Sequence, residues 1–191
     1  MPAVAQTLQG VGLAVNDLEG IVVALGPGGF SALRVGMSVA KGLALATGKP
    51  LVGIGTLEAE AGPYLDSGMP VCALLDAGRR EVASARFGRD GQRTREDLIC
   101  PPEELAAEIG EATLFCGEAA PANAGLLREY LGSRVVLAAP APAARLWALA
   151  QQGEQRLQAG DGDDVTTLQP YYLRMPTIGG PKRRDRTPQQ S

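Results

Sequence analysis

The sequence predicts an α/β protein that contains one structural unit twice, with the first copy shortened at its start. Three observations support this prediction. Short continuous apolar runs, which are typical of strands buried on both faces, alternate with longer runs of helix-forming residues. Three strands joined by tight turns open the second part of the chain. After these strands, the second part follows the same helix–strand–helix–strand–helix order as the first part.

The first half, residues 1–68, is expected to alternate helices and strands. Residues 21–25 read Ile-Val-Val-Ala-Leu and end at a Gly-Pro-Gly-Gly segment, as a buried strand would. Residues 31–47 contain good helix formers without proline, and Gly48, Lys49 and Pro50 end that helix in the usual order. A strand over residues 50–54 and a helix over residues 56–66, with Thr56 as its N-cap, follow.

The second half, residues 69–174, is expected to follow the order β-β-β-α-β-α-β-α. Turn residues separate the first three strands, and further turns separate the later elements. The expected strands cover residues 71–76, 81–87, 94–99, 113–116 and 134–137, and the expected helices cover residues 102–109, 123–131 and 143–158. Residues 175–191 are rich in glycine, proline, arginine and glutamine, so we expect them to form a disordered basic tail.

The composition excludes several classes of catalytic site. The 191 residues contain no histidine, which excludes Ser-His-Asp and Cys-His catalysis and histidine-ligated metals. The three cysteines form no CxxC pair and lie in or beside apolar segments, so they predict buried thiols rather than disulfides or a zinc site. No apolar run reaches the roughly 20 residues that span a bilayer, and the N-terminus does not resemble a signal peptide. We therefore expect a cytoplasmic protein without a membrane segment.

A glycine-rich segment, Gly26-Pro27-Gly28-Gly29, lies between the first expected strand and the helix over residues 31–47. Free backbone N–H groups and the helix dipole favour an anion at such a position. The segment is neither GxxxxGK[ST] nor GxGxxG, however, and the same glycines would suit a tight strand-to-helix turn. Both interpretations stay open on spacing alone.

The helix over residues 31–47 is apolar on nearly every side. Its polar positions form one narrow stripe at Arg34, Ser38 and Lys41. Small residues recur at i+4 spacing, at Ala32, Gly36, Ala40 and Ala44. Such a row permits close approach by another helix, within the chain or from a partner. A central helix of a three-layer domain would show the same pattern.

These segments resemble the TsaB (YeaZ-type) family, whose signature is close to GPGSFTGLRIGxxxAKGLAL. Here residues 26–36 read Gly-Pro-Gly-Gly-Phe-Ser-Ala-Leu-Arg-Val-Gly, and residues 40–45 read Ala-Lys-Gly-Leu-Ala-Leu. Further matches are Leu-Val-Gly-Ile at residues 51–54, Leu-Asp-Ala at residues 75–77 and Pro-Tyr-Tyr-Leu-Arg at residues 170–174, where the family has a terminal PxYLR. The resemblance covers about residues 1–174.

The resemblance implies an actin-like, sugar-kinase-like fold of the ribonuclease H-like class, with two β-β-β-α-β-α-β-α halves. Family members usually open with a strand ending in Asp-Thr-Ser and a hairpin, about 40 residues in all. Here the chain begins in what resembles the middle of the family's first helix. We therefore expect that the first half is truncated, that Met1 is an internal methionine and that the authentic protein starts earlier.

By the same resemblance, the chain is expected to be a non-catalytic subunit of the machinery that makes N6-threonylcarbamoyladenosine at position 37 of tRNA. The implied partners are the catalytic paralogue TsaD and the ATPase TsaE, with tRNA held indirectly through the complex and a homodimer as an alternative. The chain alone is expected to have no catalytic residue and to bind no metal or cofactor, with ATP and Mg bound in the complex through its partners.

The resemblance also suggests two sites. The partner interface would use the first helix, about residues 2–15, and the helix over residues 31–47, with the candidate contacts Leu33, Gly36, Met37, Ala40, Lys41 and Ala44. The signature loop, either structural or facing an anion, would consist of Gly26, Pro27, Gly28, Gly29, Phe30 and Arg34.

Two alternatives remain. The first is an enzyme of the same fold, either a small-molecule kinase or a glycoprotease-like enzyme, in which Asp76 with Glu81 or Asp163 with Asp164 could bind Mg²⁺. A turn pair and a solvated loop also explain these carboxylates. The second rests on charge, because residues 174–191 carry +4 and leave −7 for the rest of the chain. The tail could bind tRNA directly through Lys182, Arg183, Arg184 and Arg186, or it could only aid solubility.

Overall fold

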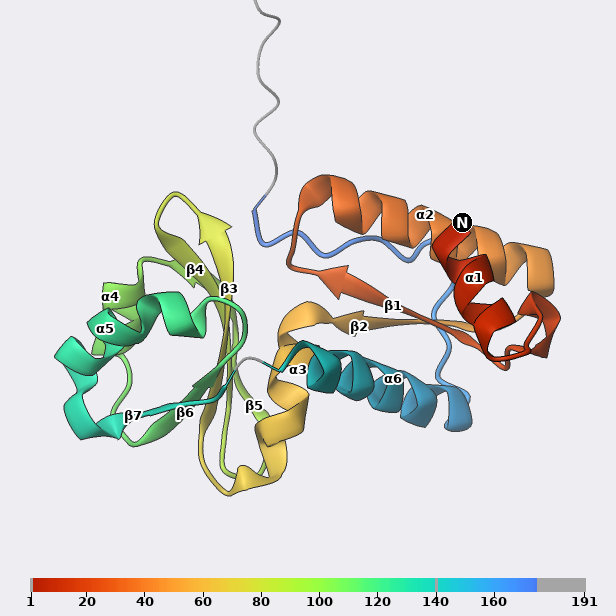
Figure 1. Ribbon diagram of the computed structural model, residues 1–191. Coiled ribbons are helices and arrows are strands. Elements are labelled where there is room, and N and C mark those ends of the chain that lie inside the picture. The colour runs from red at the N-terminus through yellow and green to blue at the C-terminus, as the bar shows by residue number, and fades with distance from the viewer. Residues whose placement is uncertain (1, 140, 175–191) are drawn as a thin grey trace, which may run out of the picture.

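The computed structural model describes residues 2–139 and 141–174 and contains two β-sheets that lie beside each other with helices around them (Figure 1). One sheet has two strands in the order β1–β2, and the other has five strands in the order β5–β4–β3–β6–β7. The predicted α/β architecture is therefore present, and each sheet is formed by one part of the chain.

The first part combines two parallel strands with three helices. They are α1 (Pro2–Gly10), β1 (Ile21–Gly26), α2 (Phe30–Thr47), β2 (Leu51–Gly55) and α3 (Thr56–Ala61). α2 ends as predicted, because Gly48 adopts the left-handed conformation with a φ of 66°. The helix predicted over residues 56–66 is shorter, since the chain continues as a 3-10 turn over Gly62–Ser67. Gly55 rather than Thr56 precedes this helix, and its N–H donates to the Glu58 carboxylate at 3.1 Å.

The second part has the order β-β-β-α-β-α-β-α. Its elements are β3 (Val71–Gly78), β4 (Glu81–Phe87), β5 (Arg93–Cys100), α4 (Pro102–Ala107), β6 (Thr113–Cys116), α5 (Ala120–Leu131), β7 (Val135–Leu137) and α6 (Pro142–Gln158). The first three strands form an antiparallel meander, β6 pairs in parallel with β3, and β7 pairs in parallel with β6.

Helices cover both faces of the five-stranded sheet, and one of them comes from the first part of the chain. On one face, α4 and α5 pack around Leu74, Phe115 and Leu127. On the other face, α3 packs against β3 and β4, with Leu57 and Ala61 in the shared core. The five-stranded sheet therefore depends on a helix that precedes it in the sequence.

The last helix, α6, leaves the second sheet and packs against β1 and β2 (Figure 1). Its Leu149 and Leu157 contact the core around Val52 on one face of this strand pair, while α2 covers the other face. Close approach requires Gly153, because a Cβ atom there would lie 2.3 Å from a methyl group of Val22. A division of the chain between residues 68 and 69 thus separates the two sheets, but it also separates each sheet from one of the helices that cover it.

Residues 159–174, which we call the C-terminal strap, run back along the first part. The strap begins at β2, where the Asp163 N–H donates to the Leu51 carbonyl at 2.8 Å. It then passes α2 and reaches the end of β1, where the Tyr171 N–H donates to the Leu25 carbonyl at 2.8 Å. The strap therefore joins both strands of the small sheet.

Several expectations from composition can be compared with the structure. All three cysteines, Cys72, Cys100 and Cys116, are buried free thiols, as predicted. No helix within residues 2–139 and 141–174 has the length and apolar character needed to cross a membrane. The tail predicted over residues 175–191 lies outside the described residues.

Candidate functional site

The signature loop connects β1 to α2 and lies against the C-terminal strap. Gly26 has a φ of 119° and is buried, and a Cβ atom at this position would lie 2.5 Å from the Tyr171 carbonyl oxygen. Only glycine suits this combination of a left-handed backbone and a close backbone neighbour. Glycine is therefore required at residue 26 because the backbone of the C-terminal strap passes so close to it.

Phe30, Arg34 and Tyr172 form a small cluster that joins the loop to the strap. The rings of Phe30 and Tyr172 lie 5.1 Å apart between centroids. The Arg34 guanidinium carbon lies 4.0 Å from the Phe30 ring centroid, and its Nε donates to the Tyr172 hydroxyl at 3.4 Å. Two sequence motifs about 140 residues apart, the signature loop and the terminal Pro-Tyr-Tyr-Leu-Arg, thus meet in one place.

A cavity of about 370 Å³ lies between the signature loop, the end of β3 and the strap. Its lining includes Gly28, Gly29, Asp76, Arg79 and Arg174. α2 begins here without a side-chain N-cap, so its first N–H groups and the two arginines favour an anion. The Asp76 carboxylate in the same lining would repel an anion. Both the structural and the anion-facing interpretations of the loop therefore stay predictions.

The six candidate interface residues do not lie on one face of α2. Gly36 is exposed, and a Cβ atom there would meet nothing within 4 Å. Leu33 is half-buried beside Gly26 and Gly28, and the half-buried Lys41 donates to the Thr166 carbonyl at 3.3 Å. The other three are buried in the chain's own core and do not reach the surface that a partner would touch: Met37, Ala40 and Ala44.

The small-residue row turns from the surface into the core because of helix geometry. Each i+4 step advances about 40° beyond one full turn, so the row does not stay on one side of the helix. Ala32 and Gly36 are exposed, whereas Ala40 and Ala44 pack on β1 and β2. The end of the row at Ala40 and Ala44 therefore packs within the chain, and contact with a partner stays a prediction for the end at Ala32 and Gly36.

The surface that α2 presents to solvent includes two large apolar side chains. Its side chains are 64% exposed at Val35 and 71% exposed at Leu45. Ser31, Arg34, Gly36 and Ser38 are exposed on this helix as well. We call its exposed apolar residues the outer face of α2, which consists of Ala32, Val35, Gly42, Leu45 and Ala46. The sequence prediction missed its large residues, although Val35 lies nine residues before Ala44, a spacing that puts the two on opposite sides of a helix.

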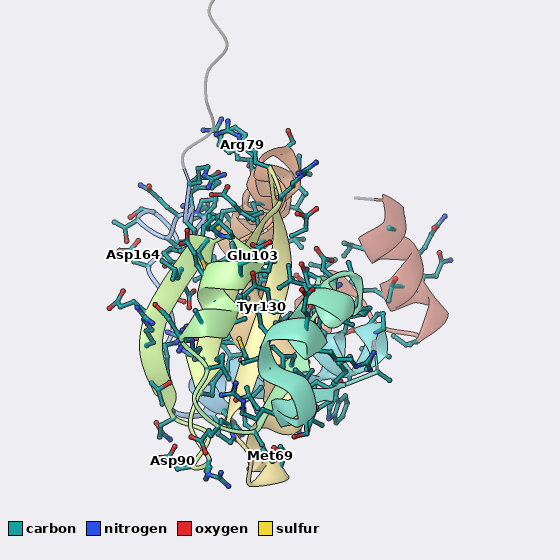
Figure 2. All side chains as sticks on the ribbon, turned by 90° about the vertical axis from the view of Figure 1, so that its left-hand side faces the viewer. Met69, Arg79, Asp90, Glu103, Tyr130 and Asp164 are labelled. Atoms are coloured by element: carbon teal, nitrogen blue, oxygen red, sulfur yellow. The ribbon has the colours of Figure 1, made fainter. Side chains whose placement is uncertain are left out.

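α1, the other helix predicted to contact a partner, ends at Gly10 and stands apart from the sheets in Figure 2. Val4 and Leu8 are only half-buried, and the side chains between them are exposed. Beyond this helix, Val11 is 65% exposed. The N-terminal segment therefore adds further apolar surface that the chain itself leaves uncovered.

The carboxylates considered as metal ligands take part in contacts within the chain. Asp163 accepts from the Gly53 N–H at 2.7 Å and pairs with Arg156 at 3.2 Å. Asp164 accepts from the N–H of Thr166 at 2.6 Å. These contacts support the interpretation of this pair as part of a loop.

The pair at the β3–β4 hairpin is engaged in the same way. Asp76 accepts from the Gly78 N–H at 2.8 Å, and Glu81 pairs with Arg174 at 2.5 Å. Within residues 2–139 and 141–174, no group of three or more His, Cys, Asp or Glu side chains could hold a metal ion.

Comparison with known proteins gives a match to a family model and to several similar proteins. The family model described as TsaD, tRNA N6-adenosine threonylcarbamoyltransferase, matches residues 1–120. An uncharacterized protein of Mycobacterium tuberculosis is 32% identical over 175 residues, which are 92% of this chain and 73% of that protein. The tRNA threonylcarbamoyladenosine biosynthesis protein TsaB of Bacillus subtilis is 29% identical over 184 residues, covering 92% of this chain and 78% of TsaB. The solved structure of YeaZ from Pseudomonas aeruginosa has a TM-score of 0.70 at 25% identity, covering 90% of this chain and 81% of YeaZ.

Proposed function

The chain belongs to the TsaD family, and from this premise we propose that it acts in the synthesis of threonylcarbamoyladenosine in tRNA as a non-catalytic subunit. The resemblance to TsaB and YeaZ and the actin-like fold, both predicted from the motifs, are confirmed by the matches above. The proposed partners are a TsaD-like paralogue that performs the transfer and a TsaE-like ATPase, with tRNA held by the complex.

The outer face of α2 supports this proposal most directly. It belongs to the helix that follows the signature loop, and its two large side chains are mostly exposed although they are apolar. Exposed apolar patches of this kind mark surfaces that another protein covers. Gly42 lies between Val35 and Leu45 along the helix, and Ala46 follows Leu45; both are small and exposed and would let a partner helix approach closely.

Capture of the TsaD-like paralogue by the full chain tests the proposed interface. Val35→Asp and Leu45→Asp should each weaken capture at least tenfold, because a carboxylate buried in an apolar contact loses its hydration. Leu146→Asp is the matched control, since Leu146 is 65% exposed on α6, away from this face. All three variants should unfold at nearly the temperature of the parent chain.

Undiminished capture by both α2 variants would show that the outer face is not the interface. Equal loss in the Leu146→Asp control would point to a general effect of added charge. A parent chain that captures no paralogue at all would contradict the proposed function itself.

We further propose that the chain alone binds neither ATP nor Mg²⁺ and that both enter the complex through its partners. The engagement of Asp163 by Gly53 and Arg156 supports this proposal. The purified chain should show no ATP hydrolysis above background. Turnover that Asp76→Ala or Asp163→Ala abolishes would instead support an enzyme of the kinase or glycoprotease type.

A further inference from the structure

One side of α6 is apolar and exposed along the first half of the helix. Leu146 is 65% exposed and Trp147 is 67% exposed, and the small residues Ala143 and Ala150 are exposed as well. Their i, i+3, i+4 and i+7 spacing places all four on one side of a helix. We call these four residues the α6 stripe. An exposed leucine next to an exposed tryptophan is typical of a surface that another protein covers.

The α6 stripe is separate from the outer face of α2. α2 and α6 cover opposite faces of the pair formed by β1 and β2 (Figure 1). Leu149 and Gly153 of α6 pack on these strands, whereas the α6 stripe is left exposed. A partner that occupies the outer face of α2 therefore leaves the α6 stripe uncovered.

The order of large and small residues along the α6 stripe fits a second copy of the same helix. In an antiparallel pair with a twofold axis between residues 148 and 149, residue 147 of one copy lies opposite residue 150 of the other. The large Trp147 side chain then lies over the small Ala150, which allows the two helices to approach closely. The twofold axis produces this contact twice, because both copies use the same surface.

The charges at the two ends of α6 fit the same arrangement. α6 begins without a side-chain N-cap, so the N–H groups of Ala143 and Ala144 have no acceptor within the helix. Glu154 is exposed, and its carboxylate accepts from the Gln158 amide at 3.1 Å. In the antiparallel pair, residue 154 lies opposite residue 143 of the second copy. The Glu154 carboxylate would therefore lie at a helix N-terminus, where the helix dipole favours a negative charge.

We propose that two copies of the chain associate through the α6 stripe as an antiparallel helix pair. This inference goes beyond the proposed function, because it uses neither the outer face of α2 nor the signature loop. Residues 143–154 span about 17 Å along the helix, which is short for a stable interface of about 800 Å² per partner. The association should therefore be weak, with a Kd of about 10–100 µM.

Sedimentation equilibrium and tryptophan fluorescence of the full chain test the inference together. Between about 2 and 500 µM, the average mass should rise from 19.8 kDa towards twice that value. Trp147 is the only tryptophan in the sequence, so its fluorescence reports on the α6 stripe itself. Its emission should move to shorter wavelengths over the same concentrations, because the indole ring leaves water in the associated form.

Two substitutions should weaken the association. Leu146→Asp places a carboxylate in the apolar contact and should keep the chain monomeric over the whole concentration range. Glu154→Lys places a positive charge at the N-terminus of the opposite helix and should weaken association at least tenfold. Because Glu154 is exposed, this second variant should fold like the parent chain even if Leu146→Asp does not.

The matched control is Tyr130→Asp, which adds the same charge at an aromatic residue of α5 that is 51% exposed. This variant should associate like the parent chain. Equal weakening in the control would show that added negative charge alone opposes association and would overturn the inference. Unchanged association of Glu154→Lys would overturn the antiparallel arrangement.

Two results with the parent chain would also overturn the inference. One is a chain that stays monomeric over the whole concentration range. The other is a dimer that forms without a change in Trp147 emission, because such a dimer would use another surface. Capture of the TsaD-like paralogue is measured in parallel. Leu146→Asp should lose self-association and retain capture, whereas absent capture by the parent chain refutes the proposed function alone.

Discussion

Burial controls the chemistry of the three cysteines. Each thiol lies in the core of the second part, and burial is the largest cause that raises the pKa of Cys72, Cys100 and Cys116. The thiolate is the form that reacts with oxidants and metals, so these side chains behave as small apolar residues. The sequence indicated this outcome, because each cysteine lies in or beside an apolar segment.

Cys72 should make the stability of the fold depend on alkaline pH. Burial raises the pKa of this thiol from 9.0 to about 12 in the folded chain. Between these values the unfolded chain releases a proton that the folded chain keeps, so stability is complete below pH 9 and falls as the pH rises. The decrease should reach about 1.4 kcal/mol per pH unit for this one group. Urea unfolding at pH 8, 9 and 10 measures it.

The variant Cys72→Ala lacks this ionisation and should lose stability less steeply over the same pH range. Its stability at pH 8 will be lower because of the cavity that the substitution leaves, so the slopes rather than the absolute values are compared. Identical slopes in parent and variant would show that Cys72 does not titrate differently in the two states.

Local sequence signals predict where the helices and strands begin and end, but they do not predict which elements pack against each other. β6 (Thr113–Cys116) has the predicted bounds, and α2 differs from its prediction by one residue at the start, because apolar runs and Gly or Pro stops are local features. The face that α2 buries was not predictable from its row of small residues, since that row crosses from surface to core. Nor did the prediction of a helix over residues 143–158 indicate that it would cover β1 and β2 rather than the sheet that precedes it.

Two positions of the α2 row should respond oppositely to the same substitution. Ala40 is 6% exposed among Ile21, Met37 and Leu51, so Ala40→Leu should overpack the core and cost about 1–3 kcal/mol. Gly36→Leu adds its side chain where nothing lies within 4 Å and should leave stability unchanged or raise it, because leucine favours a helix over glycine. Thermal unfolding of the two variants measures the difference, and equal losses would contradict the orientation of α2.

Across the whole molecule, each sheet is covered on one face by a helix from the other part of the chain. α3 covers the five-stranded sheet from the first part, and α6 covers the two-stranded sheet from the second. The ion pair between Arg93 of β5 and Glu58 of α3, at 2.8 Å, adds a polar link between the parts. The two parts should therefore be interdependent in stability, although their sheets are separate.

Two fragments with different ends should show whether the stability of the five-stranded sheet depends on the helices that cover it or on the division of the chain near residue 68. Residues 56–139 retain α3 and both covers of the five-stranded sheet, so this fragment should unfold cooperatively. Residues 69–174 lack α3 and carry α6 without its strands, so this fragment should bind an apolar dye and melt without a sharp transition. Circular dichroism and dye fluorescence measure both. Cooperative unfolding of residues 69–174 without dye binding would show that the boundary near residue 68 is also a physical one.

The crossing of α6 also has a consequence for synthesis on the ribosome. β2 is completed at Gly55, about 100 residues before α6 is completed at Gln158. At roughly 5–20 residues per second, translation needs about 5–20 s to cover that interval. Throughout it, the apolar face formed by Val22, Val52 and Ile54 of the nascent chain lacks α6, and Ala59 of α3 alone packs on it from a helix. The time during which a chaperone can bind this face is therefore set by the position of α6 in the gene and not by the rate at which the strands fold.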